Sequence, residues 1–162
     1  STKIFYVKAK MARTDFIAEG YRQTIIYDNK TGKTVILSEI GAEKYVSNLS
    51  PEEWKEQNKK YDNKEVVFTN EKKTILGYEC KKAIVKLTDG TIFSFFYALT
   101  IVPSATENPL QFKDIPGLVL EYETSSGSSN ATITYTASSV NLSPVPASRF
   151  EIPTKGFRML KQ

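Results

Sequence analysis

The residues able to do chemistry are few in this sequence. It contains no histidine, and Cys80 is its one cysteine. Without histidine, neither a Ser-His-Asp triad nor a Cys-His pair can form, and zinc held by Cys/His ligands is excluded as well. We therefore predict no catalytic residues, no metal site and no cofactor.

Paired carboxylates could hydrolyse a glycosidic bond, which makes them the remaining catalytic candidates. Glu52 and Glu53 fall in the first turn of a predicted helix, where acids complement the helix dipole. Asp114, Glu121 and Glu123 form a second group, in which the two glutamates alternate on the solvent side of a predicted strand. Both groups have a structural explanation, so we predict that the protein is not an enzyme.

Cys80 has two interpretations. Lys81 and Lys82 adjoin it and would favour a reactive thiolate. Alternatively, the thiol is a small hydrophobic group packed in a sheet, which is the interpretation we favour.

The charges are mixed rather than clustered. The chain carries 22 basic and 18 acidic residues, a net charge of +4, with no basic stripe. This pattern predicts no nucleic-acid partner, although weak attraction to anionic membranes stays open. No apolar run reaches the roughly 18–20 residues of a membrane span. The start at Ser1 fits a secreted chain from which a leader has been removed.

Strands must position these residues, because β-branched and aromatic residues dominate the periodic segments. We predict a single, mainly β (α+β) domain over residues 1–162, with a C-terminal extension over about 143–162. Hairpin-like spacing favours a meander of about eight to eleven strands. Turns are predicted at Asn29–Gly32, at Asp89-Gly90 and at the polar segment 125–130. The strand-like segments are Ile4–Met11, Gln23–Asp28, Lys33–Ser38, Glu65–Thr69, Thr74–Thr88, Thr91–Ala98, Leu118–Thr124 and Ala131–Leu142.

One helix is expected, over about residues 50–61. Ser50 is a good N-cap, Pro51 suits the first helical position, and Glu53 completes a capping box. Leu49 and Trp54 are spaced as a hydrophobic staple. The helix should lie on the sheet as a lid, with Trp54 as its main anchor.

The strand around Cys80 contains a mismatch of parity. With Asp89-Gly90 as a two-residue turn, Ala83 pairs with Phe96. Side chains alternate along a strand, so Cys80, three residues before Ala83, would lie on the opposite face. Burying both Ala83 and Cys80 then requires an extra residue, so we predict a β-bulge near Lys81-Lys82.

Several segments resemble a family of uncharacterised secreted proteins of Bacteroidota. They are Thr74–Ala83, Asp89-Gly90, Phe96-Tyr97 and Ile101–Pro103. The segment Ile115–Tyr122 is similar to the GLPGLI motif that names one such family, with Asp114 and Ile115 where that name implies Gly and Leu. The ending Phe150–Phe157 is also similar to theirs.

This resemblance implies an architecture like that of the lipoprotein carriers LolA and LolB. A curved antiparallel sheet would form a half-open barrel with one or two lid helices. The implied role is non-enzymatic binding of a lipid or other apolar ligand, in the periplasm or at the outer membrane. The predicted apolar cavity would be lined by Phe5, Val7, Met11, Val35, Leu37, Trp54, Phe68, Leu118, Leu120, Ile133 and Tyr135.

An alternative stays open at this point. The chain could be a cell-envelope module that binds another protein and no small ligand. Its contact patch would then be formed by Phe93, Phe95 and Tyr97.

Overall fold

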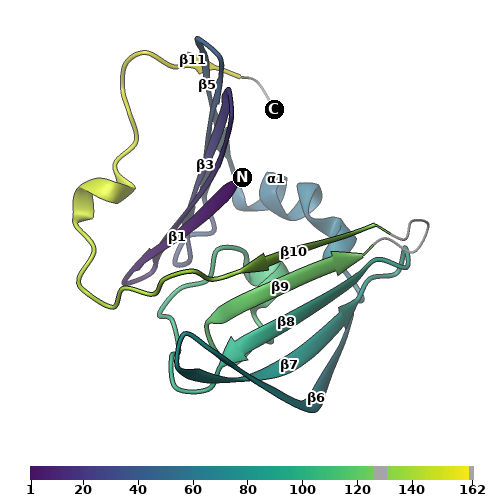
Figure 1. Cartoon of the computed structure of the whole chain (residues 1–162). Helices are drawn as coiled ribbons and strands as arrows, with labels where there is room; N and C mark the ends of the chain where they lie inside the picture. The colour runs from purple at the N-terminus through teal and green to yellow at the C-terminus, as the bar shows by residue number, and fades with distance from the viewer. Residues whose placement is uncertain (126–130, 161–162) are drawn as a thin grey trace. The chain divides into compact units, whose positions relative to one another are not determined.

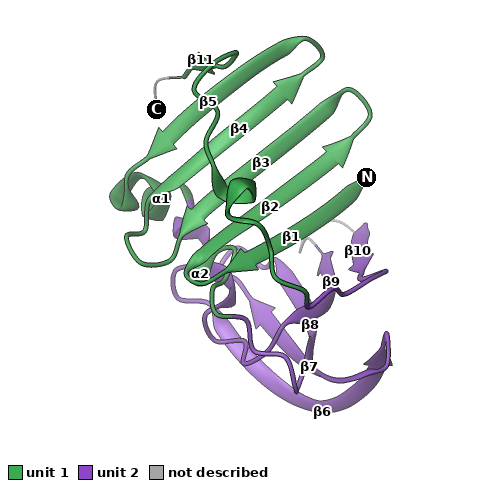
Figure 2. Ribbon diagram, turned by 90° about the vertical axis from the view of Figure 1, so that its left-hand side faces the viewer, with its two compact units in different colours: residues 1–57, 104–109, 143–162 green, residues 58–103, 110–142 purple. Residues whose placement is uncertain are grey.

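The strands of this protein divide between two compact units (Figures 1 and 2). The structure, a computed structural model, describes residues 1–125 and 131–160. Unit 1 comprises Ser1–Gln57, Ser104–Pro109 and Ser143–Gln162, and unit 2 comprises Asn58–Pro103 and Leu110–Leu142. The mainly β prediction is confirmed. The strands form two sheets, where the sequence predicted one curved sheet.

Unit 1 contains a six-stranded sheet in the order β1-β2-β3-β4-β5-β11. The first five strands form the predicted antiparallel meander, and β11 pairs in parallel with β5. The C-terminal extension therefore belongs to this sheet. The elements are β1 (Thr2–Lys8), β2 (Met11–Ala18), β3 (Tyr21–Asp28), β4 (Thr34–Ile40), β5 (Glu43–Leu49), α1 (Pro51–Gln57), η2 (Ala147–Phe150) and β11 (Arg158–Met159).

Local signals in unit 1 gave two correct predictions. The turn between β3 and β4 is closed by bonds from Asp28 N to Lys33 O (3.0 Å) and from Gly32 N to Asp28 O (2.8 Å). Gly32 has a φ of 80°, a conformation that glycine adopts without strain. The capping box also forms, with Ser50 N donating to Glu53 Oε1 and Glu53 N donating to Ser50 Oγ, both at 3.1 Å.

Two boundaries in unit 1 differ from the prediction. Ile4–Met11 is not one strand, because the chain reverses at Ala9-Lys10 and Met11 begins β2 opposite Lys8. Ala9 has a positive φ of 52°, a conformation for which its residue type gives no signal. The helix ends at Gln57, and a separate 3-10 turn, η1 (Lys59–Tyr61), follows in unit 2. The residue between them, Asn58, has a φ of −110° and a ψ of 18°.

Unit 2 contains a five-stranded antiparallel meander in the order β10-β9-β8-β7-β6. The predicted loop over Pro103–Lys113 holds one short helix, α2. Of the predicted turn over residues 125–130, Ser125 ends β9 and the other positions lie outside the described residues. The elements are β6 (Glu65–Ile75), β7 (Tyr78–Lys86), β8 (Ile92–Ala98), α2 (Pro109–Phe112), β9 (Val119–Ser125) and β10 (Thr132–Thr136).

Two turns set the strands of unit 2. Thr74–Thr88 is not one strand, because Leu76 and Gly77, with φ of 53° and 82°, form a two-residue turn between β6 and β7. A type I′ hairpin requires positive φ at both positions. Leucine rarely adopts this conformation, so the sequence did not indicate a turn here. The turn after β7 has three residues instead of two, since Leu87 N bonds to Thr91 O and Gly90 N to Leu87 O.

That extra turn residue shifts the pairing and removes the predicted mismatch. Ala83 pairs with Phe95, and the register of β7 with β8 is regular from Lys86 to Cys80. The parity argument for a bulge near Lys81-Lys82 is therefore wrong, because β7 has no extra residue toward β8, although the pairing of β7 with β6 does shift register opposite Lys82. The irregularity lies on β6, between Phe68 and Lys72. A hydrophobic cluster packs on each face of this sheet, so Ala83 and Cys80 are buried on opposite faces of β7.

The core of unit 2 has one cluster on each face of the sheet. The first surrounds Phe95 and includes Phe93, Tyr97 and Phe112. The predicted contact patch of Phe93, Phe95 and Tyr97 is therefore wrong, because these side chains are buried together. The second cluster includes Cys80, Phe96, Ala98 and Leu120.

Close packing in this core explains why residue 117 is a glycine. A Cβ at this position would overlap the backbone oxygen of Ala98. The chain runs close to β8 here, with bonds from Ala98 N to Leu118 O and from Leu118 N to Ile101 O, both 2.8 Å. Only glycine allows this approach, which accounts for the glycine in the segment Ile115–Tyr122.

Cys80 is fully buried, and we expect its thiol to be inert in the folded protein. Burial raises the pKa of the thiol, and the charge of Glu121 adds to the effect, against a smaller opposing hydrogen bond at Ile75. Since the thiolate is the reactive form, Ellman's reagent should label Cys80 slowly in native protein and rapidly in denaturant. Cys80→Ser should cost about 1–2 kcal/mol of unfolding free energy. Immediate labelling of folded protein would contradict this expectation.

Candidate functional site

The strand register sorts the side chains of unit 1 onto two faces of its sheet. Residues directly opposite each other on neighbouring antiparallel strands share a face, and successive residues alternate. We name the face that carries Tyr27 the α1 face, because the Trp54 ring of α1 packs against the Tyr27 ring with centroids 5.9 Å apart. We name the face that carries Ile26 the strap face, because the C-terminal segment crosses it (Figure 2).

The strap face contains a buried ion network. Asp15, which is 0% exposed, accepts hydrogen bonds from Arg13 Nε (2.9 Å), Arg22 Nη2 (3.1 Å) and Thr24 Oγ1 (2.9 Å). Burial raises the pKa of Asp15, but these hydrogen bonds and the two guanidinium charges outweigh it and hold the pKa below its usual value. Because every group is engaged within the protein, we interpret this network as structural.

The same network fastens the C-terminal segment. Arg13 Nη1 donates to the Arg149 carbonyl oxygen at 2.7 Å. The Arg149 guanidinium lies 5.1 Å from the centre of the Tyr6 ring, and that of Arg13 lies 5.7 Å from it. Further along, Leu160 N donates to Val46 O at 2.9 Å. Residues of its own unit therefore cover part of the strap face, on which Ile26, Leu37 and Val46 are buried and Ile4, Ile17 and Val35 are half-buried.

The α1 face is covered only in part. Beneath Trp54, the row formed by Ala12, Tyr27, Thr34 and Leu49 is buried. Beyond this row the apolar side chains are half-buried or exposed, and Ile40 reaches 55% exposure. We name this second part the open apolar face, and its members are Phe5, Phe16, Tyr21, Ile25, Ile36, Ile40 and Tyr45.

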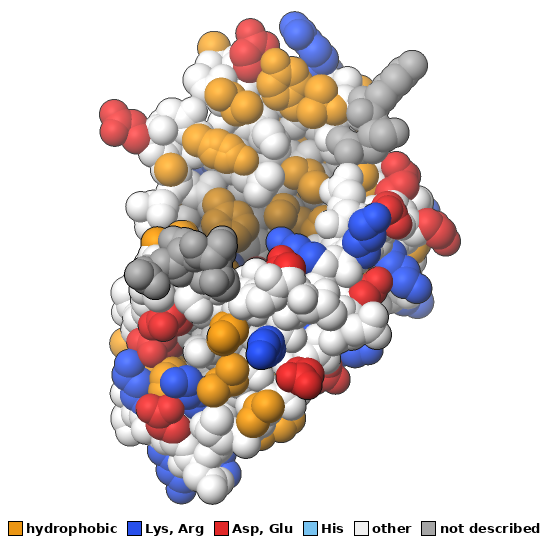
Figure 3. Space-filling view, turned by 90° about the vertical axis from the view of Figure 1, so that its right-hand side faces the viewer, with side chains coloured by type: hydrophobic (Ala, Val, Ile, Leu, Met, Phe, Trp, Pro, Cys, Tyr) orange, Lys and Arg blue, Asp and Glu red, His pale blue; other side chains and the backbone are white. Residues whose placement is uncertain are grey.

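The open apolar face extends over five strands. Figure 3, which views unit 1 from the side of α1, shows hydrophobic side chains grouped there. Ile25 and Ile36 lie at its centre, directly opposite each other on β3 and β4. Ile25 and Ile36 are only half-buried although they lie at the centre of the sheet, and apolar patches on a protein surface often mark binding sites. We therefore take this face as the candidate functional site.

One edge of the open apolar face carries an ion pair. Lys3 Nζ contacts Glu107 Oε1 at 2.8 Å, and Thr14 Oγ1 donates to Glu107 Oε2 at 3.1 Å. The segment that carries Glu107 is held in place by Asn29, which bonds to both Thr106 O (2.9 Å) and Thr106 N (3.1 Å). Lys3 is thus neutralised by a carboxylate in a fixed position.

The predicted cavity residues do not share one face. In unit 1, Phe5 and Val7 lie on the α1 face, whereas Met11, Val35 and Leu37 lie on the strap face. In unit 2, Leu120 is buried beside Cys80 and Leu118 packs against the same cluster. The remaining three lie on the other face of that sheet, with Phe68 53% exposed, Ile133 exposed and Tyr135 stacked on Tyr122.

Sequence reasoning missed most of the open apolar face. Ile25 and Ile36 were not selected, because each is followed by another apolar residue, Ile26 and Leu37. Alternation therefore cannot tell which neighbour faces which side. Phe16 was missed with the whole of β2, in which Arg13 and Asp15 interrupt the apolar pattern.

The carboxylates that were weighed as catalytic candidates have separate partners. Glu121 accepts two hydrogen bonds from Lys73 Nζ, both 2.9 Å, and one from Thr136 Oγ1 at 2.8 Å. Glu123 accepts from Thr134 Oγ1, and Asp114 contacts Lys64 Nζ at 3.3 Å. Within residues 1–125 and 131–160, no three His, Cys, Asp or Glu side chains gather as metal ligands would.

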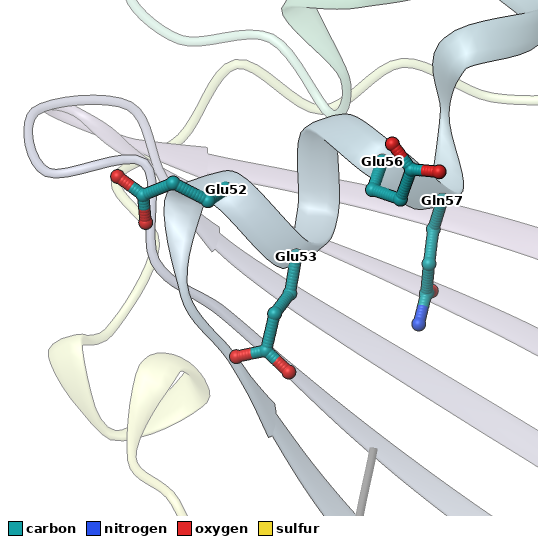
Figure 4. A pocket seen from close by; sticks show the side chains of 4 residues that line it. All are labelled: Glu52, Glu53, Glu56 and Gln57. Carbon is teal, nitrogen blue, oxygen red and sulfur yellow. The ribbon is translucent and has the colours of Figure 1, made fainter.

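Two shallow pockets are lined mainly by polar side chains. One, of about 340 Å³, is lined by Glu52, Glu53, Glu56 and Gln57, all from α1 (Figure 4). The other, of about 290 Å³, lies in unit 2. Its lining residues are Tyr61, Asp62, Asn63, Lys64, Leu110, Lys113 and Asp114. No residue of the open apolar face lines either pocket.

The chain was compared with protein-family models, curated proteins and solved structures. No protein-family model matches the sequence. No curated protein matches it either. Among the described residues, no helix is long and apolar enough to cross a membrane. Among solved structures, the chain is similar to one of PNGF-II, with 13% sequence identity and a TM-score of 0.49 over 94% of this chain. The similarity covers 28% of the PNGF-II chain, so this chain spans less than a third of its length.

Proposed function

We propose that this protein is a non-enzymatic binding protein for a lipid or other apolar ligand, and that the open apolar face of unit 1 contacts the ligand. The observation that carries the proposal is the incomplete burial of Ile25 and Ile36 at the centre of the sheet. Covering such side chains with an apolar ligand yields about 25 cal/mol for each Å² removed from water. The family resemblance supports a role in the periplasm or at the outer membrane, with a LolA/LolB-like half-open barrel.

The test is a binding titration with N-phenyl-1-naphthylamine, an uncharged dye that brightens in apolar surroundings. We expect saturable binding that weakens about tenfold in the double variant Ile25→Thr/Ile36→Thr. Losing roughly 55 Å² of apolar contact costs about 1.4 kcal/mol, which corresponds to this factor. Threonine keeps the β-branched shape, so the strands should persist.

The matched control is Val102→Thr, which makes the same kind of change at a side chain that is 74% exposed and lies outside the face. It should bind the dye as the wild type does. Equal dye affinity in the double variant and the wild type, with both folded by circular dichroism, would contradict the proposal. Native mass spectrometry gives a second test, since a copurifying lipid supports a carrier.

The alternative of a protein-binding module has one observation in its favour. Val67 and Phe68 are adjacent, exposed apolar residues on β6, an edge strand of the unit 2 sheet. Edge strands with exposed apolar residues are prone to pair with other chains. A clean monomer in native mass spectrometry that captures a specific envelope protein, and loses it on Phe68→Ser, would favour this function.

A further inference from the structure

An arginine lies at the edge of the open apolar face. The short strand β11 pairs in parallel with β5, which places Arg158 directly opposite Tyr45. Opposite residues share a face of the sheet, and the Arg158 guanidinium lies 6.0 Å from the centre of the Tyr45 ring. Arg158 is therefore a cation at the β5 end of an apolar surface.

Arg158 differs from the other cations around this sheet in its partners. Lys3, at the β1 end of the face, is paired with Glu107 at 2.8 Å. Lys44 lies on the strap face, where it is 3.8 Å from Glu39. Among the described residues, no carboxylate lies within ion-pair distance of Arg158, which is solvent-exposed. The guanidinium is thus available to a ligand.

The distance across the face suits a long acyl chain. From β5 to β1 there are four inter-strand spacings of about 4.8 Å, or about 19 Å in all. Ile36, Ile25 and Phe5 lie in one register row that crosses the face, with Thr14 between Ile25 and Phe5 and Ser47 at its β5 end. An acyl chain crossing the face over these side chains would bring its head group to the β5 edge, where Tyr45 lies two residues from Ser47 and opposite Arg158.

We propose that Arg158 recognises the anionic head group of a single-chain lipid whose acyl chain lies on the open apolar face. This inference rests on the proposed function. A planar guanidinium can donate two hydrogen bonds to one carboxylate or phosphate group. An uncharged head group lacks the negative charge that strengthens these hydrogen bonds. Glu43, two residues before Tyr45 on the same face of β5, opposes the anion and weakens its binding.

The test compares two ligands with the same acyl chain, oleate and 1-oleoylglycerol, by displacement of N-phenyl-1-naphthylamine. We expect oleate to bind about fivefold to tenfold more tightly than 1-oleoylglycerol. Arg158→Gln should abolish this preference and leave the affinity for 1-oleoylglycerol within twofold. Glu43→Gln should increase the preference, and added salt should reduce it in the wild type.

The matched control is Lys155→Gln, which removes one positive charge from an exposed residue of the same segment and should not change the preference. Oleoyl phosphate in place of oleate distinguishes a carboxylate head group from a phosphate one. Equal binding of oleate and 1-oleoylglycerol, or an unchanged preference in Arg158→Gln, would overturn the role of Arg158 and leave the proposed function standing. Binding of neither ligand would instead contradict the proposed function.

Discussion

Replacing Asp15 with alanine is expected to destabilise unit 1 by about 3–5 kcal/mol, the usual cost of removing one partner of a buried ion network. The carboxylate is fully buried and accepts hydrogen bonds from Arg13, Arg22 and Thr24. Its loss leaves two guanidinium groups without a counter-charge and weakens the attachment of the C-terminal segment through Arg13. Thermal or urea unfolding followed by Trp54 fluorescence measures the effect, because Trp54 is the only tryptophan.

The effect should depend on pH in a defined direction. The pKa of Asp15 is lowered in the folded protein. Its contribution to stability is therefore fully present above the unfolded pKa of about 3.9 and is lost as the pH falls through the folded value. The difference between wild type and Asp15→Ala should shrink below about pH 4. Asp62→Ala, at an exposed aspartate, is the control and should cost less than about 0.5 kcal/mol. A difference that grows toward pH 2.5 would contradict the ion-network interpretation.

Replacing Trp54 with alanine should cost about 3–5 kcal/mol, as is usual for a large buried ring. The side chain is 8% exposed and contacts Tyr27, and it is the anchor by which α1 covers its row of the sheet. Loss of the ring would uncover that row and leave a cavity above Tyr27. Circular dichroism in a urea titration measures the change, since the variant lacks the fluorescent side chain.

Trp54→Phe is the matched control, because it keeps an aromatic ring at the site, and its cost should be clearly smaller. In the wild type, the burial of Trp54 predicts a blue-shifted emission and weak quenching by acrylamide. An emission maximum typical of solvent-exposed tryptophan, quenched freely, would show that α1 does not dock through this residue.

The parts of this fold that the sequence predicts well depend on neighbouring residues alone. Ser50 and Glu53 are three residues apart, so their reciprocal hydrogen bonds follow from helix geometry. The turn at Gly32 and the meander order likewise follow from local turn chemistry and hairpin spacing. Two turns were missed because Ala9 and Leu76, which have positive φ, are not typical turn residues, and the turn at Asp89-Gly90 has one residue more than predicted.

A mainly β chain with a capped helix and a buried cysteine could be predicted from the residues alone. Which side of a strand is buried depends instead on the segments that pack against the sheet. Ile25 and Ile26 are chemically identical neighbours, yet Ile26 lies on the strap face and is buried, whereas Ile25 lies on the open apolar face. The cover comes from residues 143–160 and from Trp54, which are remote from β3 in sequence. No local pattern encodes where such remote segments pack, because burial is a property of long-range contacts.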